Sequence, residues 1–334
     1  MFYKTLGKIE LENADLMSGN TPKFSSGRKR LFFERARKVK EKALSGSMIV
    51  TRCTPDTAEL ESTVFKKGKT NFKDEAGYFD YAADKNSENR YVWWMNFADP
   101  KLFGYYGGPM FAQDEIQVFE HPILGSLREY LLDRTEEGMK PWALTLRDGQ
   151  PHTPTPYLIE QAPQWQKVDT TPRLPLGGIG MIYGHNFSTA PDEELEAGIK
   201  IVDGDIRNNI MACSAIVGSG QYSYEDIELQ FTTLLCAYKA AKDFSSEKGK
   251  RCIVHGGMWW GCGSFGGNPE LMLFLQICAA GLCGVDELVL HAVDDDAYED
   301  ALDMYLDMED EMSLDGIIMM LYDKEYYWGL SDGN

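Results

Sequence analysis

Two neighbouring carboxylates stand out in the sequence GYYGGPMFAQDEIQVFEHPIL, residues 104–124. A glycine pair, Gly107 and Gly108, precedes them and lets the backbone pass close to a bulky group. Gln113 opens a segment with helical character, so Asp114 and Glu115 fall in a first helical turn, where the helix dipole favours ionised carboxylates. Either could act as a base or anchor a ligand hydroxyl, or both could only complement the dipole. Because adjacent helical side chains point about 100° apart, the two do not form a retaining glycosidase pair around one atom.

A second segment that could do chemistry is HGGMWWGCGSFGGNPELMLFLQ, residues 255–276. Its glycines fall between an expected strand and an expected helix, where backbone N–H groups can face an anion with the helix dipole behind them. Phe265 could lie flat on a sugar or a ring. No Gly-Lys-Ser/Thr follows, so this is not a nucleotide-binding loop of the Walker type. The segment predicts a ligand that combines phosphate with sugar.

The chain as a whole has 334 residues, a length that suits about two domains or one large α/β domain with an attached segment. Lys and Arg number 33 against 52 Asp and Glu, so the net charge is −19. Such a surface repels phosphate backbones, which argues against a nucleic-acid binder. A hydrophobic fraction of 43% allows a sizeable core.

Strands and helices alternate along most of the chain. Polar stretches at 66–90 and 141–175 are expected to be loop and turn. The expected strands cover 48–53, 92–98, 179–184, 199–203, 251–256 and 286–293, and the expected helices cover Tyr224–Ala241 and Asn268–Cys283. This alternation predicts an α/β sheet covered by helices on both faces.

Two charged segments each allow two interpretations. Residues 27–46 are basic and predict a helix capped by Ser25 or Ser26, which is either a solvated helix packed against an acidic body or a basic arm for nucleic acid or acidic lipid. Its expected apolar side consists of Leu31, Phe32, Ala36, Val39 and Ala43. Residues 294–311 carry ten acids and no base, which suits an acidic surface helix or a docking surface for a basic protein.

The seven cysteines are scattered, with no pair spaced as in Cys-X-X-Cys, and the five histidines are scattered as well. We therefore expect reduced thiols, no metal site and no cofactor. The first twelve residues lack the apolar core of a secretory signal. The longest apolar run, Leu271–Val285, is too short to span a bilayer, so no membrane association is expected.

Five segments resemble the poly(ADP-ribose) glycohydrolases, in the same order along the chain. The sequence WGCGSFGGNPELMLFLQICAA (260–280) resembles the diphosphate-binding loop and following helix of that family. YGGPMFAQDEI (106–116) looks like its catalytic loop, and NFAD (96–99) is similar to a short element on the preceding strand. IKIVDGD (199–205) resembles another strand of the family, and IGMIYGHNF (179–187) falls where the family places an aromatic ring over adenine. The likeness covers about two thirds of the chain.

The resemblance implies a macrodomain-like α/β fold of three layers, α/β/α, with a mixed central sheet. Residues 91–330 would form this domain and residues 1–90 an N-terminal accessory segment of helix and loop. The glycine loop would bind diphosphate, Phe97 and Tyr183 would bracket adenine with Asn96 at its edge, and Phe265 would pack on the distal ribose. The ADP-ribose-binding residues implied are Asn96, Phe97, Gly107, Gly108, Gln113, Tyr183, Gly261, Cys262, Gly263, Ser264, Phe265, Gly266 and Gly267. Glu115 would be the main catalytic residue, with Asp114 and Asp99 next.

The chain also departs from the family pattern. Pro109 replaces the third glycine, the spacer before Gln113 is short, and the acid and amide of NFAD have traded places, which leaves an acid at Asp99. An acid there suits a cationic leaving group, as in ADP-ribosylated arginine. This is similar to effectors of the Legionella type, which remove ADP-ribose from arginine of ubiquitin.

The sequence therefore predicts a hydrolase that releases ADP-ribose from a modified protein, arginine favoured, with a basic protein such as ubiquitin as a partner. Three alternatives remain: a reader that binds ADP-ribose without cleaving it, a poly(ADP-ribose) glycohydrolase, and an interaction protein with an unused pocket. The expected location is the cytoplasm, or a host cytosol if the protein is a bacterial effector.

Overall fold

The computed structural model describes residues 2–135, 142–147, 152–171, 181–291 and 294–332. The strands are β1 (Tyr3–Glu12), β2 (Ser47–Pro55), β3 (Val64–Lys66), β4 (Asn71–Glu75), β5 (Arg90–Ala98), β6 (Leu146–Arg147), β7 (Thr153–Pro154), β8 (Tyr157–Val168), β9 (Ile199–Ser214), β10 (Arg251–Gly257), β11 (Glu287–His291) and β12 (Glu311–Ser313). The helices are α1 (Asn13–Gly19), α2 (Gly27–Lys40), α3 (Thr57–Ser62), α4 (Gln113–Glu120), α5 (Pro122–Leu132), α6 (Asn186–Thr189), α7 (Asp192–Gly198), α8 (Tyr224–Glu247), α9 (Pro269–Cys283), α10 (Asp295–Asp307) and α11 (Leu314–Tyr322), with a 3₁₀ turn η1 at Glu41–Ala43.

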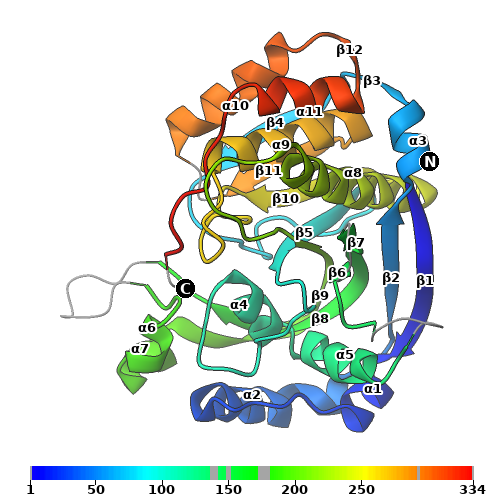
Figure 1. Ribbon diagram of the computed structural model, residues 1–334. Helices are drawn as coiled ribbons and strands as arrows, with labels where there is room; N and C mark the ends of the chain where they lie inside the picture. Colours follow the sequence, from blue (N-terminus) through cyan, green and yellow to red (C-terminus); the bar gives the residue numbers. More distant parts are fainter. Residues whose placement is uncertain (1, 136–141, 148–151, 172–180, 292–293, 333–334) are drawn as a thin grey trace.

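Eight of these strands form one mixed sheet in the order β1-β2-β8-β9-β5-β10-β11-β4 (Figure 1). The strands from β9 to β4 run parallel to one another, whereas β1, β2 and β8 pair antiparallel. Parallel strands place their carboxyl ends on one edge of the sheet, and open α/β sheets bind ligands at that edge.

The central strand β5 shows why the sheet needs helices on both faces. Tyr91, Trp93 and Met95 pack into the core on one face, and Val92 and Trp94 pack into the core on the other. A strand with five consecutive apolar residues, as at 91–95, must be covered on both sides.

Helices accordingly cover both faces (Figure 1). α8, α9, α10 and α11 pack on one face, and α1, α2, α4 and α5 lie against the other. The α/β class with a mixed central sheet and three layers, predicted from the sequence, is confirmed.

The first 90 residues differ from the expected helix and loop. The helix expected after Ser26 is present as α2, and the Ser26 hydroxyl accepts a hydrogen bond from Lys29 N. However, β1, β2 and β4 belong to the central sheet itself, and of these three only β2 was expected, as the strand at 48–53. β1 was missed because its exposed face carries charged residues, and β4, a strand at the sheet edge, has a largely exposed sequence, NFKDE.

The expected loop at 141–175 contains the 12-residue strand β8. Its glutamines obscured the strand because they read as polar, yet Gln164 and Gln166 are buried and hydrogen-bonded, the latter to the carbonyl of Phe119 at 3.0 Å. The strand expected at 179–184 is wrong over residues 181–184, which form a bend and a turn, and its first two residues lie outside the described ranges.

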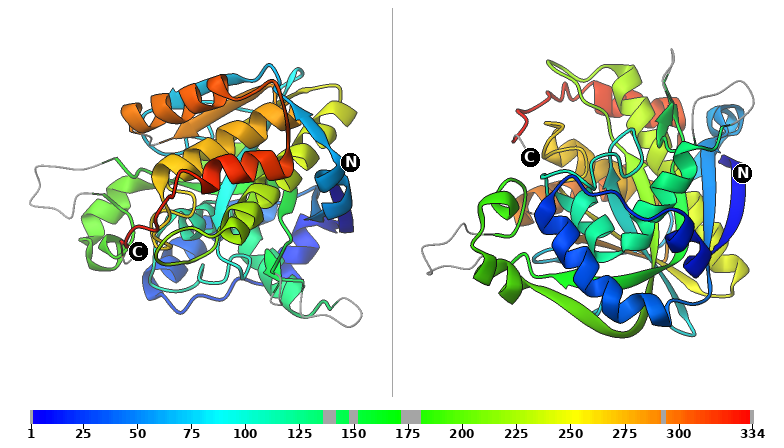
Figure 2. Two further views of the ribbon diagram at one scale, coloured as in Figure 1. Left: turned by 45° about the horizontal axis from the view of Figure 1, so that its top comes forward. Right: turned by 90° about the horizontal axis from the view of Figure 1, so that it is seen from below.

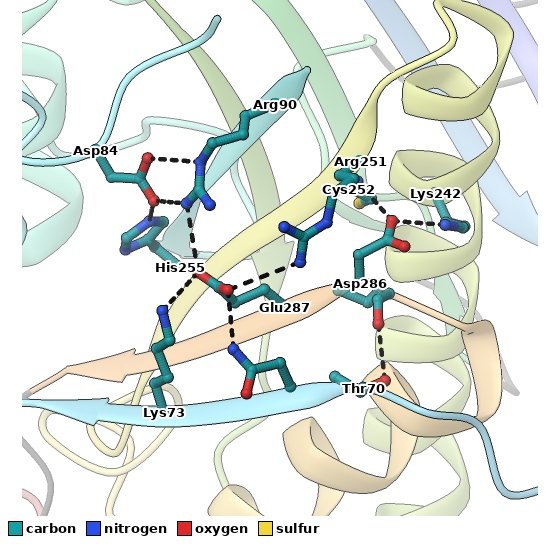
Figure 3. Close-up of polar contacts among 12 residues, drawn as sticks. Thr70, Lys73, Asp84, Arg90, Lys242, Arg251, Cys252, His255, Asp286 and Glu287 are labelled. Atoms are coloured by element: carbon teal, nitrogen blue, oxygen red, sulfur yellow. Dashed lines mark hydrogen bonds and ion pairs between the residues drawn. The ribbon is translucent and has the colours of Figure 1, made fainter.

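A polar cluster joins the amino-terminal ends of the parallel strands, away from the edge where their carboxyl ends meet (Figure 3). Glu287 at the start of β11 forms ion pairs with Arg90 Nη2 at 3.3 Å and Lys73 Nζ at 3.1 Å, and it accepts a hydrogen bond from Asn71 at 2.9 Å. Arg251 at the start of β10 lies 3.9 Å from the same carboxylate. The cluster fixes the amino-terminal ends of these strands. A ligand site is therefore expected at the opposite edge of the sheet, where the carboxyl ends meet.

All seven cysteines are buried and unpaired. Within the described part of the chain, no helix combines the length and apolar character that crossing a membrane requires.

Candidate ADP-ribose site

A cavity of about 590 Å³ opens at the carboxyl ends of β5, β9 and β10. This volume falls in the usual range for small-molecule sites, roughly 300–1,000 Å³. The cavity is lined by Tyr78, Phe97, Ala98, Asp99, Tyr105, Gly108, Pro109, Met110, Ala112, Gln113, Asp114, Glu115, Tyr183, Ala215, Val217, Trp259, Trp260, Gly261, Gly263, Ser264, Phe265 and Asp332. Both segments that the sequence singled out therefore meet in one place.

Two glutamines fix the strand ends that border the cavity. Gln113, the first residue of α4, accepts a hydrogen bond from Phe97 N at 2.8 Å and donates one to the Met95 carbonyl at 3.1 Å. Gln276 on α9 does the same for β10, since it bonds both the N–H and the carbonyl of Gly257. These amide clamps hold α4 and the glycine loop at set positions relative to the sheet.

Asp114 and Glu115 are both buried and both line the cavity. Asn96 donates to Asp114 Oδ1 at 3.0 Å, and Glu115 Oε2 accepts from Ala112 N at 2.9 Å. Burial raises the pKa of Glu115, and Lys29 opposes that rise. Burial and the charge of Glu115 raise the pKa of Asp114 well above its usual range. The sequence predicted ionised carboxylates from the helix dipole, but burial raises both pKa values and so favours the protonated forms more than the dipole alone would.

Asp99 follows β5 and is half-buried at the cavity wall. Its Oδ1 accepts a hydrogen bond from Lys101 N at 2.8 Å. Burial raises the pKa of this carboxyl, although the Lys101 N–H and the charges of Lys101 and Arg128 oppose the rise. A third acid therefore faces the cavity beside the two on α4.

Residues 23–29 hold the loop between β5 and α4 in place. The Gly107 carbonyl accepts hydrogen bonds from Ser25 N and Ser26 N, both at 2.9 Å. A Cβ at Gly107 would lie 2.2 Å from the carbonyl oxygen of Lys23. Gly107 is therefore needed for contact with the chain's own backbone, while Gly108 lines the cavity.

The glycine loop 261–267 forms a compact turn before α9. Gly261 and Gly266 have positive φ angles of 72° and 68°, which favour glycine. Gly267 N donates to the Gly261 carbonyl at 2.8 Å, and a Cβ at Gly267 would lie 2.5 Å from that oxygen. Asn268 caps α9 by accepting from Leu271 N. The glycines thus make a tight fold whose backbone borders the cavity.

A late segment of the chain, residues 326–332, passes beside this loop (Figure 2). Gly329 N donates to the Gly266 carbonyl at 2.7 Å, and Asp332 N donates to the Gly263 carbonyl at 3.2 Å. The Asp332 carboxylate lies against Gly263, where a Cβ would be 3.2 Å from Oδ2. Asp332 is the fourth acid at the cavity.

Aromatic rings connect the main cavity to a smaller one. Tyr78 and Tyr183 stack with ring centroids 5.7 Å apart. These two residues, together with Phe97, Gln113 and Trp259, line both cavities, and His291 lies in the smaller one. Burial and the neighbouring His255 lower the pKa of His291 to about 3, so this ring is neutral.

The structure brings most of the predicted site residues together. Eleven of them line the main cavity: Phe97, Asp99, Gly108, Gln113, Asp114, Glu115, Tyr183, Gly261, Gly263, Ser264 and Phe265. Five do not: Asn96, Gly107, Cys262, Gly266 and Gly267. Asn96 is fully buried and its amide holds Asp114, which leaves it away from the expected adenine edge.

Sequence reasoning missed several wall residues and one buried cation. Tyr78, Val217 and Asp332 belong to loops without a motif, whereas Tyr105 lies in the segment 104–124 but was not picked out. Lys29 had a signal that was misread. The buried stripe of α2 is Lys29, Phe32, Phe33 and Ala36, at helical spacing, whereas the expected Leu31 and Val39 are 50% and 60% exposed and Ala43 is exposed as well. A lysine on the buried side of a helix indicates a cation whose charge has a specific role.

Residues 183–300 match the family model of the poly(ADP-ribose) glycohydrolases, described as having the macro domain fold. The matched region includes the whole glycine loop and supports the resemblance drawn from the sequence. No curated protein matches. The finer resemblance to effectors of the Legionella type stays a prediction.

Two of the solved structures that are similar to this chain are poly(ADP-ribose) glycohydrolases. One is the poly(ADP-ribose) glycohydrolase of Thermomonospora curvata, with 11% identity and a TM-score of 0.42 over 84% of this chain and 99% of that one. The other is the poly(ADP-ribose) glycohydrolase of Deinococcus radiodurans in complex with ADP-ribose, with 13% identity and a TM-score of 0.42 over 89% and 95% of the two chains.

Proposed function

We propose that this chain is an ADP-ribosyl hydrolase that cleaves the glycosidic bond between ADP-ribose and a protein side chain. One observation carries the proposal: two buried carboxylates on α4 and the glycine loop line the same cavity. A glycosidic bond needs carboxyl groups at its anomeric carbon, and a diphosphate needs backbone donors. This cavity offers both, and the two segments that supply them resemble segments of a known glycohydrolase family.

The ligand would lie across the cavity from aromatic rings to carboxylates. The backbone of Gly261, Gly263 and Ser264 would hold the diphosphate. Phe97 and Tyr183, with Tyr78 stacked on the latter, would bracket adenine. Phe265 would then pack on the distal ribose, next to α4.

The reaction would break the bond between the anomeric carbon and the side-chain atom. The electron pair stays with the leaving atom, which takes a proton from a carboxyl group. Water adds to the anomeric carbon and gives its proton back to the carboxylate. Glu115 is proposed for this proton transfer because it lines the cavity and because burial raises its pKa, which favours the protonated form. The other carboxylates would stabilise the positive charge that develops on the sugar.

The charge of the cavity favours an arginine-linked substrate. Among the described residues that line it, four are acids and none is basic: Asp99, Asp114, Glu115 and Asp332. Such a wall suits a guanidinium leaving group better than an ester of an acidic side chain. A basic protein such as ubiquitin would be a fitting partner, and the acidic helix α10 offers a surface for it.

Poly(ADP-ribose) cleavage is the second candidate function. It is favoured by the family match over residues 183–300, since that family is named for this reaction. The two candidates differ in the leaving group, which is a ribose hydroxyl in the polymer and a side-chain nitrogen in ADP-ribosyl arginine. One assay can therefore separate them.

The experiment incubates the protein with proteins mono-ADP-ribosylated on Arg, Glu or Ser, and with poly(ADP-ribose), and measures free ADP-ribose. We expect release from the arginine linkage. Release from the polymer alone would establish the second candidate instead. No release together with ADP-ribose binding, measured by calorimetry, would mean that the protein is a reader. Absence of both would refute the proposed site.

Glu115→Gln should lower the rate of release at least about a hundredfold while ADP-ribose binding stays within a few-fold. The matched control is Glu160→Gln, which also removes a buried carboxylate. Glu160 lies on β8, where it accepts a hydrogen bond from Tyr91 and pairs with Lys248. Equal turnover in Glu115→Gln and wild type would remove Glu115 from the proposed role.

A further inference from the structure

Lys29 on α2 is a fully buried lysine, with none of its surface exposed. Its Nζ donates hydrogen bonds to the carbonyl oxygens of Tyr106 at 2.8 Å and Met110 at 2.5 Å. Both acceptors belong to the loop between β5 and α4, and Met110 lines the cavity. The lysine therefore fastens this loop at two points from a helix nearly eighty residues earlier in the chain.

The same ammonium group interacts with the carboxylates of α4. Burial lowers the pKa of Lys29 to about 8, and the charges of Glu115 and Asp114 oppose that change. In the other direction, Lys29 is the main charge that opposes the rise in the pKa of Glu115. The ammonium also lies 5.3 Å from the centre of the Phe111 ring, which precedes α4.

Stability alone does not explain a lysine at this position. Burying a charge costs several kcal/mol in stability, and an apolar side chain in its place often gives equal or greater stability in a packed interior. The neighbours on the stripe, Phe32, Phe33 and Ala36, are all apolar and buried. The ammonium contacts of Lys29 instead fall on the loop between β5 and α4, at Tyr106, Met110 and Phe111.

We propose that Lys29 is a positioning residue of this site: its ammonium group fixes the loop at Tyr106 and Met110 and places a buried positive charge beside Glu115 and Asp114. The expected effect on rate rests on the proposed function. The positioning of the loop rests only on the two hydrogen bonds that Lys29 donates. It also gives the first 90 residues a direct part in the site, which no motif of the sequence indicated.

Besides Lys29, three other groups set the electrostatic surroundings of the two carboxylates: Asp99, Tyr183 and Arg128. The charges of Glu115 and Asp114, adjacent on α4, interact with each other and with Asp99 at the end of β5, and Tyr183 interacts with Glu115 from the segment before α6. Arg128 on α5 interacts with Asp114 and Asp99 and also donates to the Leu102 carbonyl. Lys29 is the cation whose charge bears on Glu115 itself.

The test replaces Lys29 and follows Glu115 directly. The carboxyl titration of Glu115 is measured by carbon-13 NMR on protein labelled at glutamate side chains, with the signal assigned by its loss in Glu115→Gln. We expect Lys29→Met to raise the pKa of Glu115 by about one unit. Lys29→Arg keeps the charge and should leave that midpoint close to wild type.

Hydrolysis gives the second readout. Lys29→Met should lower kcat at least about tenfold and move the pH profile in the same direction as the NMR midpoint. Lys29→Arg should restore the profile but raise KM, because a larger head group displaces the loop at Met110. If Lys29→Met does not fold, Lys29→Gln removes the charge while keeping a donor for one carbonyl.

Arg52→Met is the matched control. Arg52 is also a buried cation, 1% exposed, and it donates to the Leu144 carbonyl and to Thr155 away from the cavity. We expect it to lose stability without moving the Glu115 midpoint. The inference is overturned if Lys29→Met leaves the midpoint unchanged, or if Arg52→Met shifts it equally. If wild type releases no ADP-ribose, the proposed function fails, while the NMR titration still decides the role of Lys29.

Discussion

Glu120, at the end of α4, allows a quantitative test of the burial described here. Its side chain is 4% exposed, and its Oε1 accepts a hydrogen bond from Val168 N at 2.7 Å. Burial raises its pKa from 4.5 to about 8, only partly offset by the Val168 N–H and the charge of Lys167, while Asp80 adds to the rise. The replacement Glu120→Gln keeps an acceptor for Val168 N and removes the ionisable group.

The sign follows from proton linkage. Below pH 4.5 the carboxyl is protonated in both the folded and the unfolded chain, so it has no effect. Between pH 4.5 and about 8 only the folded state keeps the proton, and stability falls by about 1.4 kcal/mol per pH unit. Above pH 8 the loss is complete, at roughly 5 kcal/mol for the pKa of about 8. Glu120→Gln should therefore gain stability over wild type as pH rises.

The assay is urea denaturation of both proteins at several pH values from 5 to about 8.5. The quantity of interest is the difference in free energy of unfolding between variant and wild type. Other buried groups cancel in this difference. His121 and His291, whose pKa values burial lowers to about 4 and about 3, destabilise both proteins equally as pH falls below 6.5. A difference that changes by less than about 1 kcal/mol over this range would refute the reasoning.

Two further predictions concern the glycine loop. Asp332→Asn should tighten ADP-ribose binding about three- to tenfold at low salt, because the Asp332 carboxylate beside Gly263 repels a diphosphate. Calorimetry at about 0.01 M and about 0.5 M salt should show that the gain in affinity shrinks as salt rises. Weaker binding by the variant would instead assign Asp332 to holding the loop. Gly261→Ala should cost about 2 kcal/mol more than the control Gly249→Ala. Both positions have positive φ, but only at Gly261 does a Cβ meet neighbours, Ala215 at 2.7 Å being the nearest, so equal losses in urea denaturation would contradict the packing described.

Much of the fold could be predicted where the local sequence and the burial agree. The continuous apolar runs of β5, β10 and β11 and the capped helices α8 and α9 were found because nothing in them conflicts with their environment. β8 was missed because buried glutamines satisfy their amides through partners that lie far away in sequence. The sequence gives no indication of those partners.

The site divides in the same way. The glycine loop was recognisable because its shape depends on glycines at fixed positions. The carboxylates were found, but their raised pKa values were not, because the burial of Glu115 that raises its pKa arises only in the folded chain. Lys29 and Asp332 were missed because they reach the site from opposite parts of the chain.

The contact between the glycine loop and residues 326–332 has a consequence for how the protein acquires its site. Gly266 and Gly329 are 63 residues apart in sequence, yet they share a backbone hydrogen bond. Contacts of such separation carry the entropy cost of closing a long loop, so we expect this one to form after the local contacts of the intervening helices and strands. The glycine loop would then take its final shape late in folding. A ligand that binds it would slow hydrogen exchange in residues 326–332 as well as in the loop itself.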